Sequence, residues 1–234
     1  MRQSSIRSGW RRVLKRSFDL AAAALALILL SPLFLVIGAA IKLHDRGPIF
    51  YRGERVGVGG KRFRILKFRT MVSNAERLGG SSTPLDDPRV TPIGRMLRAV
   101  KLDELPQLLN VLTGDMSLVG PRPQVAWAVA LYSEAERELL SVRPGITDYA
   151  SLRFRNEAEI LRGSRDPDRD YLEKIAPEKL KLGLLYVRDG SFLTDVRILV
   201  ATGVALLGGD PNWLLGLPPA GDVRSVTPRT PTAS

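Results

Sequence analysis

Two adjacent carboxylates, Asp103 and Glu104, are the residues of this 234-residue sequence best suited to chemistry. They lie between two stretches of helical periodicity, where Asp103 is predicted to cap the second helix, with Glu104 at its first position and Pro106 in its first turn. The macrodipole at a helix N-terminus favours an ionised carboxylate by about 0.3–1 kcal/mol. A capped helix alone would explain the pair, so a chemical role depends on the residues around it.

Basic residues supply that context. Lys67, Arg69, Arg98 and Arg122 occur in alternating or turn-rich segments rather than on one solvent-facing helix surface. An ionised carboxylate among cations suits nucleophilic attack on phosphorus, because the charge that develops there must be neutralised by cations or Mg²⁺. Carboxylate oxygen is also the ligand type that Mg²⁺ prefers. Glu104 could therefore bind the metal or move a proton.

Composition excludes several other kinds of chemistry. The chain contains no cysteine, and His44 is its only histidine. Disulfides, thiolate or multi-histidine metal sites and Ser-His-Asp triads are therefore ruled out. Residues 1–80 hold 16 Lys/Arg and 4 Asp/Glu, a net charge of +12, whereas residues 81–234 have a net charge of −1. This asymmetry predicts an anionic partner for the N-terminal third: nucleic acid, an acidic membrane surface or a phosphorylated substrate.

An apolar segment decides among these partners. Leu20–Ile41 runs for 22 residues without a charge, which corresponds to about 33 Å of helix and is enough to cross a bilayer. Both flanks are basic, which favours the cytoplasmic side for both ends. Ser31-Pro32 is expected to bend the helix, with the serine bonding a carbonyl that proline leaves free. We expect a re-entrant helix, with a spanning helix as the alternative, and anionic lipids rather than nucleic acid as the partner of the flanks.

The remaining patterns indicate the elements that position the dyad. The alternation over Phe63–Arg69 predicts a strand, and Thr91-Pro92 predicts the start of a helix. A second helix is expected to end at Thr113-Gly114. The other predicted elements are a short strand Pro48–Arg52, a stiff loop Pro121–Pro123, an amphipathic helix Gln124–Val142, a turn Arg143–Thr147 and a helix over 171–188 that Pro177 could break. The apolar stretch Ile198–Leu207 is too short to span a membrane and suits burial in the core or at an interface.

Several of these segments together resemble a known family. The sequence motifs that carry the resemblance are Lys67–Met71, Asp87–Arg95, Leu102–Leu112, Gly114–Pro123 and Arg143–Thr147. They look like those of the bacterial sugar transferases, the small monotopic phosphoglycosyl transferases that act on polyprenol phosphate. The resemblance runs from about Lys15 to Gly208. Two departures are Lys101, where Ser or Thr is common, and Asp148–Ser151, which replaces a frequent Gly-Trp continuation.

The resemblance implies a fold, a reaction and a site. The fold would be α/β and mostly helical. The protein would be monotopic in the bacterial inner membrane, with a re-entrant helix kinked at Ser31-Pro32 and a catalytic domain that faces the cytoplasm. Asp103 would attack a nucleotide sugar, with UDP the expected nucleotide, and hold the phosphosugar covalently. Mg²⁺ would be the cofactor of Asp103 and Glu104. Lys67, Arg69, Arg98 and Arg122 would bind phosphate.

The product would be a hexose 1-phosphate on undecaprenyl phosphate, the first membrane step towards an exopolysaccharide or another surface glycan. A homo-oligomer is an open alternative. The expected organisation is a basic segment 1–19, a membrane helix 20–41, a catalytic domain 42–209 and a disordered tail 210–234. Rival classes fit less well. A soluble Rossmann-like glycosyltransferase would need a helix after the glycines at 57–60, and a non-enzymatic anchor would have no need for the dyad.

Overall fold

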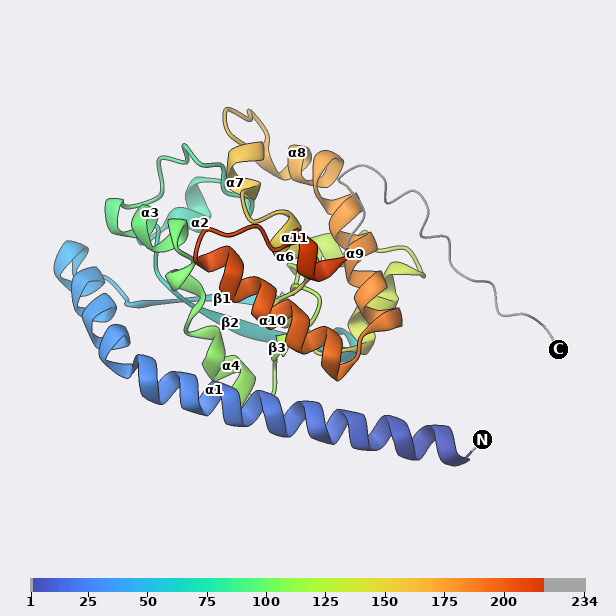
Figure 1. Ribbon diagram of the computed structural model, residues 1–234. Coiled ribbons are helices and arrows are strands. Elements are labelled where there is room, and N and C mark those ends of the chain that lie inside the picture. The colour runs from blue at the N-terminus through green and yellow to red at the C-terminus, as the bar shows by residue number, and fades with distance from the viewer. Residues whose placement is uncertain (1, 217–234) are drawn as a thin grey trace.

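The computed structural model describes residues 2–216, without the side chains of residues 2–8 and Glu76. The protein is mostly helical and carries two small two-stranded sheets (Figure 1). Most of the tail predicted over 210–234 lies outside the described residues, and α11 forms within the part that is described. The α-helices are α1 (Arg2–Asp45), α2 (Ala75–Leu78), α3 (Pro92–Ala99), α4 (Gln107–Thr113), α5 (Ala126–Ala130), α6 (Tyr149–Arg153), α7 (Glu157–Ile160), α8 (Pro167–Lys174), α9 (Ala176–Asp189), α10 (Phe192–Leu206) and α11 (Asn212–Leu215). The strands are β1 (Phe50–Val56), β2 (Arg62–Phe68), β3 (Ser117–Val119) and β4 (Gly145–Thr147), and the 3₁₀ helices are η1 (Val58–Gly60), η2 (Leu102–Glu104) and η3 (Glu136–Ser141).

Helix α1 continues through Pro32, and it bends in its C-terminal part (Figure 1). Proline has no N–H, so the carbonyl of Ile28, four residues earlier, loses its usual donor. The hydroxyl of Ser31 donates to that carbonyl at 2.8 Å. The compensation predicted for Ser31-Pro32 is therefore present in the structure.

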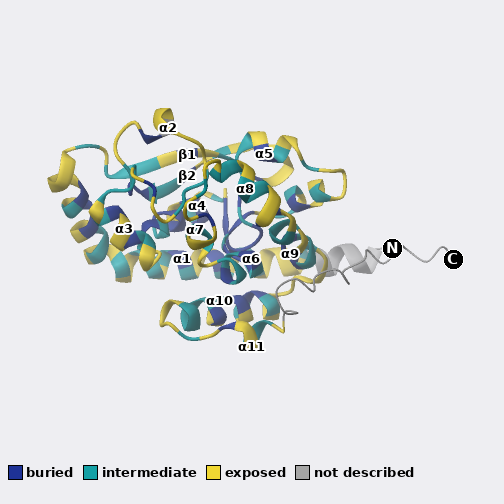
Figure 2. Ribbon diagram, turned by 90° about the horizontal axis from the view of Figure 1, so that it is seen from above, coloured by how far each residue is buried: buried dark blue, intermediate teal, exposed yellow. Residues whose placement is uncertain are grey.

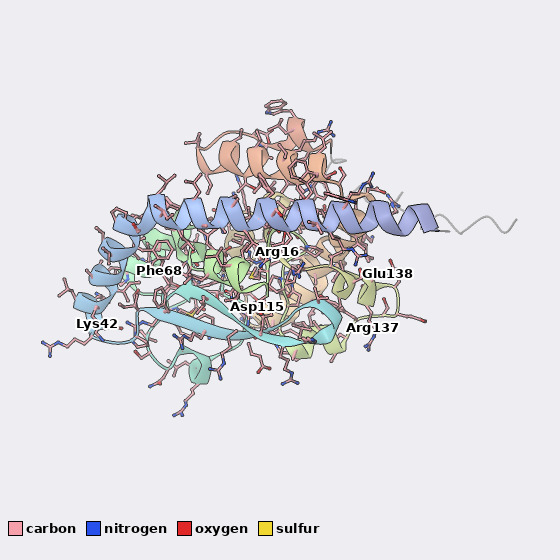
Figure 3. All side chains as sticks on the ribbon, turned by 90° about the horizontal axis from the view of Figure 1, so that it is seen from below. Arg16, Lys42, Phe68, Asp115, Arg137 and Glu138 are labelled. Atoms are coloured by element: carbon pink, nitrogen blue, oxygen red, sulfur yellow. The ribbon has the colours of Figure 1, made fainter. Side chains whose placement is uncertain are left out.

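Both halves of α1 lie against the rest of the protein. Ala23 is part of the main core, while Ile37 and Ile41 pack with Phe68 and Leu97 in a second cluster. Figure 3 shows α1 crossing the domain, with Arg16 and Phe68 close to the contact, and Figure 2 shows buried positions along its inner side. Its outer side carries exposed apolar residues, namely Leu25, Ile28, Leu29, Leu35 and Val36. Within the described residues, this is the one helix long and apolar enough to cross a membrane.

The hairpin of β1 and β2 places one of the predicted cations. The two strands pair antiparallel from Phe50 opposite Phe68 to Val56 opposite Arg62. Asn110 of α4 binds this hairpin from below: its Nδ2 donates to the carbonyl of Arg64 at 2.9 Å, and its Oδ1 accepts from the amide of Leu66 at 2.8 Å. Because α4 follows directly after the dyad, these bonds fix the distance between β2 and the dyad.

Strands β3 and β4 form a short parallel pair that positions the Pro121–Pro123 loop. Ser117 lies opposite Gly145 and Val119 opposite Thr147. A Cβ at Gly145 would come within 2.1 Å of the backbone nitrogen of Gly120, so a side chain there would push the two segments apart. The glycine of the predicted Arg143–Thr147 turn is thus required by a backbone-to-backbone contact.

Two predicted helices need correction. Gln124–Val142 is not one amphipathic helix: α5 ends at Ala130, and the 3₁₀ helix η3 follows. The hydroxyl and backbone nitrogen of Ser133 both bond Glu136, which starts a new turn and interrupts the first helix. The helix predicted over 171–188 is divided at Ile175 into α8 and α9, with Pro177 in the first turn of α9 as anticipated. The start at Thr91-Pro92 is confirmed, because Thr91 Oγ1 accepts from the Gly94 amide at 3.0 Å.

Candidate active site

The helix-cap geometry predicted for the dyad is wrong. Lys101 adopts a left-handed conformation, with φ 58°, and Asp103 and Glu104 lie inside the 3₁₀ turn η2. Helix α4 begins only at Gln107, after Pro106, and no side chain caps it. Pro106 takes the N-cap position, where the missing N–H removes no hydrogen bond of the helix. Asp103 therefore does not owe its charge state to a cap at the start of α4.

Glu104 lies between two cations from different elements. Lys67 Nζ, at the end of β2, lies 2.9 Å from Oε1 of Glu104. Arg122 Nη1 lies 3.0 Å from Oε2, and Arg122 Nη2 contacts Oε1. Burial opposes ionisation, but Arg122 and Lys67 outweigh it and hold the pKa of Glu104 well below its usual range. Glu104 is therefore an anion held in place by two charge-assisted contacts.

Asp103 has a different environment from its neighbour. Its side chain is 6% exposed, and its Oδ1 has no hydrogen-bond partner. Burial, reinforced by the negative charge of Glu104, raises the pKa of Asp103, while the nearby charges of Lys67, Arg98 and Lys101 act in the opposite direction. A buried carboxylate oxygen without a donor is costly unless a ligand or water completes it. Asp103 Oδ1 is therefore an acceptor that a ligand or water can complete.

Arg98 approaches Asp103 from the last turn of α3. Its Nε donates to Thr70 Oγ1 at 2.8 Å, and the charges of Asp103 and Asp87 act on its guanidinium. Burial lowers the pKa of Arg98, but an arginine remains cationic throughout the working pH range. Arg98 therefore places a positive charge beside Asp103 without pairing with it directly.

Arg69, also predicted to bind phosphate, lies in a different set of contacts. Its guanidinium pairs with Asp45, at the end of α1, and contacts the hydroxyl of Ser73. The side chain is 8% exposed. A Cβ at Gly47 would overlap the same guanidinium, so the chain closes tightly around it. The structure brings Lys67, Arg98 and Arg122 to the dyad, whereas Arg69 connects α1 to the end of β2.

Gln107 is a residue that the sequence analysis did not single out. It is fully buried, and neither its Oε1 nor its Nε2 has a hydrogen-bond partner. It is the first residue of α4, which follows the 3₁₀ turn that carries Asp103. A buried polar residue among the apolar positions that open α4 was the signal available in the sequence.

The backbone of the Pro121–Pro123 loop is held by Asp148. The amide of Arg122 donates to Asp148 Oδ2 at 3.2 Å, and the amide of Ser151 donates to Asp148 Oδ1 at 2.6 Å. Asp148 therefore caps α6 and fixes the loop that carries Arg122.

A polar network joins this core to the N-terminal part of α1. Lys15 Nζ lies 2.7 Å from Asp195 Oδ2 and 3.0 Å from the Val119 carbonyl. Tyr186 donates to Asp195 Oδ1 at 2.7 Å, and the buried Asp19 accepts from the Ser117 hydroxyl at 2.7 Å. Lys15, which belongs to the basic flank predicted to bind lipid headgroups, is thus engaged with protein.

The residues present can be tested against Mg²⁺. Among the described residues, no group of three or more histidine, aspartate or glutamate side chains is placed to hold a metal ion. Mg²⁺ in phosphoryl-transfer sites commonly takes one or two carboxylates and completes its shell with water and substrate phosphates. The unpartnered Oδ1 of Asp103 fits such a ligand. Glu104 would first have to release Lys67 or Arg122, because both its oxygens are occupied.

Comparisons with known proteins show which family the chain is similar to. Residues 10–209 match the model of a family described as bacterial sugar transferase. The exopolysaccharide production protein ExoY of Sinorhizobium fredii is 40% identical over 203 residues, covering 80% of this chain and 83% of that protein. A UDP-glucose:undecaprenyl-phosphate glucose-1-phosphate transferase of Caulobacter vibrioides is 40% identical over 199 residues, covering 84% of this chain and 70% of that protein. An Escherichia coli enzyme of the same name is also 40% identical, with 83% of this chain matching 40% of the longer protein.

Proposed function

The chain belongs to the bacterial sugar transferase family, and from that premise we propose that it moves a hexose 1-phosphate from a UDP-sugar to undecaprenyl phosphate through a covalent phosphosugar on Asp103. The protein is an enzyme and a sugar-phosphate transferase, like the relatives named for that activity. The observation that carries the covalent route is the buried, unpartnered Oδ1 of Asp103 beside three cations.

The first half of the reaction forms a bond to Asp103. An oxygen of its carboxylate attacks the phosphorus that bears the sugar, the bond from that phosphorus to the bridging oxygen breaks, and UMP leaves with the bond's electron pair. The positive charges of Lys67 and Arg98, which act on Asp103, would stabilise the charge on the phosphoryl oxygens. When bound, Mg²⁺ would supply further neutralisation of the diphosphate.

The second half regenerates the carboxylate. A phosphate oxygen of the lipid attacks the same phosphorus, the bond between phosphorus and Asp103 breaks, and a lipid-linked diphosphosugar is released. Glu104 remains an anion between Lys67 and Arg122 and positions both cations. Arg122 is the better placed of the two to hold a donor phosphate, because a guanidinium carries five N–H donors and keeps some of them beyond its contacts to Glu104 and the Ile146 carbonyl.

Donor alone tests the covalent route. Purified enzyme with UDP-sugar and Mg²⁺, but without lipid, should release UMP in a burst equal to the enzyme concentration. The same sample should carry a sugar-phosphate on the peptide that contains Asp103, detected by intact-protein and peptide mass spectrometry. Strictly sequential kinetics without an adduct would contradict the covalent route and leave Asp103 as a base or a metal ligand.

We further propose that α1 enters one leaflet of the bacterial inner membrane and returns, with the catalytic domain in the cytoplasm and anionic lipids around the basic flanks. The packing of α1 supports this topology. Asp19 contacts Ser117 before the apolar stretch, and Asp45 pairs with Arg69 after it, so both ends of the helix lie on one domain. A helix that crossed the bilayer would carry one of these ends to the opposite side.

Cysteine labelling tests this topology, because the native chain has no cysteine. Ser17→Cys, before the apolar stretch, and Asn74→Cys, in the catalytic domain, are both exposed positions. In inside-out vesicles both should react with a membrane-impermeant maleimide, and in right-side-out vesicles neither should. Labelling of the two positions from opposite faces would favour the spanning alternative.

A further inference from the structure

A cavity of about 180 Å³ lies beside Arg122, on a different part of the domain from α1. It is lined by α5, η3, α6, α8 and α9, and no described side chain of α1 lines it. Most of its lining is apolar, and two tyrosines, Tyr132 and Tyr171, contribute aromatic rings. No step of the proposed reaction uses this cavity.

Arg122 connects the cavity to the reacting centre. The same residue lines the cavity and donates to both carboxylate oxygens of Glu104, the neighbour of Asp103. A diphosphate held at Arg122 and facing Asp103 therefore has the cavity within reach of its other end. Because a nucleotide sugar carries its nucleoside on the far phosphate from the sugar, the cavity lies where the leaving half of the donor needs space.

The chemistry of the lining selects among the possible occupants. Lys179 lies in the wall, but Glu157 neutralises it, and its Nζ lies 5.2 Å from the centre of the Tyr171 ring. The lining also includes the carboxylates of Glu136 and Asp148, which already accept hydrogen bonds from Ser133 and from the Ser151 amide. The buried hydroxyl of Ser151 has no hydrogen-bond partner. A hexose in this cavity would bury several hydroxyls against apolar walls, which costs free energy because they would lose hydrogen bonds to water. A planar base needs apolar and aromatic faces and few hydrogen bonds.

The membrane-bound acceptor is a poor occupant for the same cavity. A polyprenol chain must reach the enzyme from the bilayer, and the exposed apolar side of α1 is the surface suited to contact it. Since α1 contributes nothing to the lining, the cavity is separate from that surface.

We infer that this cavity binds the nucleoside of the donor, with the base against Tyr132 and Tyr171 and the diphosphate extending past Arg122 to Asp103. This inference rests on the proposed function and deepens it. It assigns donor recognition to α5, α6, α8 and α9, and acceptor recognition to the side of α1.

A matched pair of substitutions on α5 tests the assignment. Ala128 is 7% exposed and lines the cavity, whereas Ala130, two residues later on the same helix, is exposed to solvent. Ala128→Leu should fill part of the cavity, and Ala130→Leu is the control of identical chemistry. Leu131→Trp, at an exposed position of the cavity wall, is a second variant whose folding does not depend on core packing.

Binding is measured by calorimetry on the full chain in lipid nanodiscs, with UDP and inorganic diphosphate as probes. We expect Ala128→Leu and Leu131→Trp to weaken UDP binding at least tenfold, with inorganic diphosphate unchanged and Ala130→Leu like the wild type. A wild-type enzyme that binds inorganic diphosphate as tightly as UDP would overturn the assignment. Equally weakened binding of UDP and inorganic diphosphate in the folded variants would also overturn the assignment, because the substitutions would then affect phosphate binding rather than nucleoside binding.

Steady-state kinetics separate this inference from the proposed function. If both hold, the cavity variants should raise KM for the UDP-sugar at least tenfold and leave KM for undecaprenyl phosphate unchanged. Transfer with an unchanged donor KM in both folded variants would refute the cavity assignment while the function stood. A wild type that binds UDP but transfers nothing would refute the function, and loss of UDP binding in Ala128→Leu would still support the cavity.

Discussion

The two carboxylates of the dyad are adjacent in sequence, yet their surroundings are opposite. Around Glu104 every charge has a partner, since Lys67 and Arg122 occupy both of its oxygens. The Oδ1 of Asp103, by contrast, is buried without a hydrogen bond, and so are both side-chain polar atoms of Gln107 at the start of α4. Satisfied polar groups rigidify a site, whereas unsatisfied ones reduce stability and await a ligand. The comparison assigns Glu104 to positioning and Asp103 to reaction.

Asp103→Asn gives the largest expected effect. An amide is a poor nucleophile, so both the UMP burst and turnover should fall by on the order of 10⁴-fold or more. Folding should be unaffected or slightly improved, because the variant removes a buried charge that has no direct partner. Burst amplitude and thermal unfolding of the same sample measure both effects. A variant that keeps its burst would reverse the roles assigned to the two carboxylates.

Arg122→Ala is expected to have the second largest effect, since it removes one of the two cations that hold Glu104. Glu104 would keep only Lys67, and the unfolding free energy should fall by about 1–3 kcal/mol. Turnover should fall by roughly 10²–10³-fold as the donor phosphate loses its cation. Arg122→Lys should recover only part of it, because an ammonium has no bidentate fork. Arg143, whose Nε donates to the Gly114 carbonyl away from the dyad, gives the control Arg143→Ala, which should retain activity.

Gln107→Leu tests whether the unpartnered polar atoms lower the stability of the folded protein. Leucine has nearly the volume of glutamine and no polar atoms, so it relieves two unpaired buried groups, each costing about 1–3 kcal/mol. We expect an unfolding free energy equal to or above that of the wild type, together with turnover lowered by about tenfold or more. Asn110→Leu is the contrast, because Asn110 has its partners in β2 and its loss should destabilise the protein. Full activity in Gln107→Leu would mean that an internal water, not substrate, completes this amide.

Features that depend on neighbouring residues could be predicted from the sequence, whereas contacts that depend on tertiary packing could not. Local patterns predicted the start of α3 at Thr91 and the Ser31-Pro32 compensation, because each depends on residues a few positions apart. The catalytic role of the dyad stays a prediction. The pairing of Arg69 with Asp45 depends on how α1 packs, and no local pattern encodes it. Asp103 was predicted as a helix cap because its residue type favours that position, but the left-handed Lys101 forms a 3₁₀ turn instead. Burial then replaced the macrodipole as the main influence on its pKa.

The smallest expected effect concerns the pH at which Asp103 loses its charge. Its raised pKa means that attack is available above that pKa and is lost as the pH falls through it, so the acid limb of kcat/KM for the donor should lie above the pH typical of a free aspartate. Lys101, which is exposed, contributes a positive charge that lowers this pKa.

Lys101→Ala removes that charge, so the pKa of Asp103 should rise further and the acid limb should move to higher pH, with little change on the plateau. Lys61→Ala, in the β1–β2 turn, removes an equal charge that is not among the main influences on Asp103, and its profile should match the wild type. Added salt should narrow the difference between Lys101→Ala and the wild type, because it screens an exposed charge. The profile is measured as single-turnover UMP release with donor alone, so that lipid binding does not contribute. An acid limb that stays in place, or moves to lower pH, would show that Asp103 is not the group whose ionisation limits the attack.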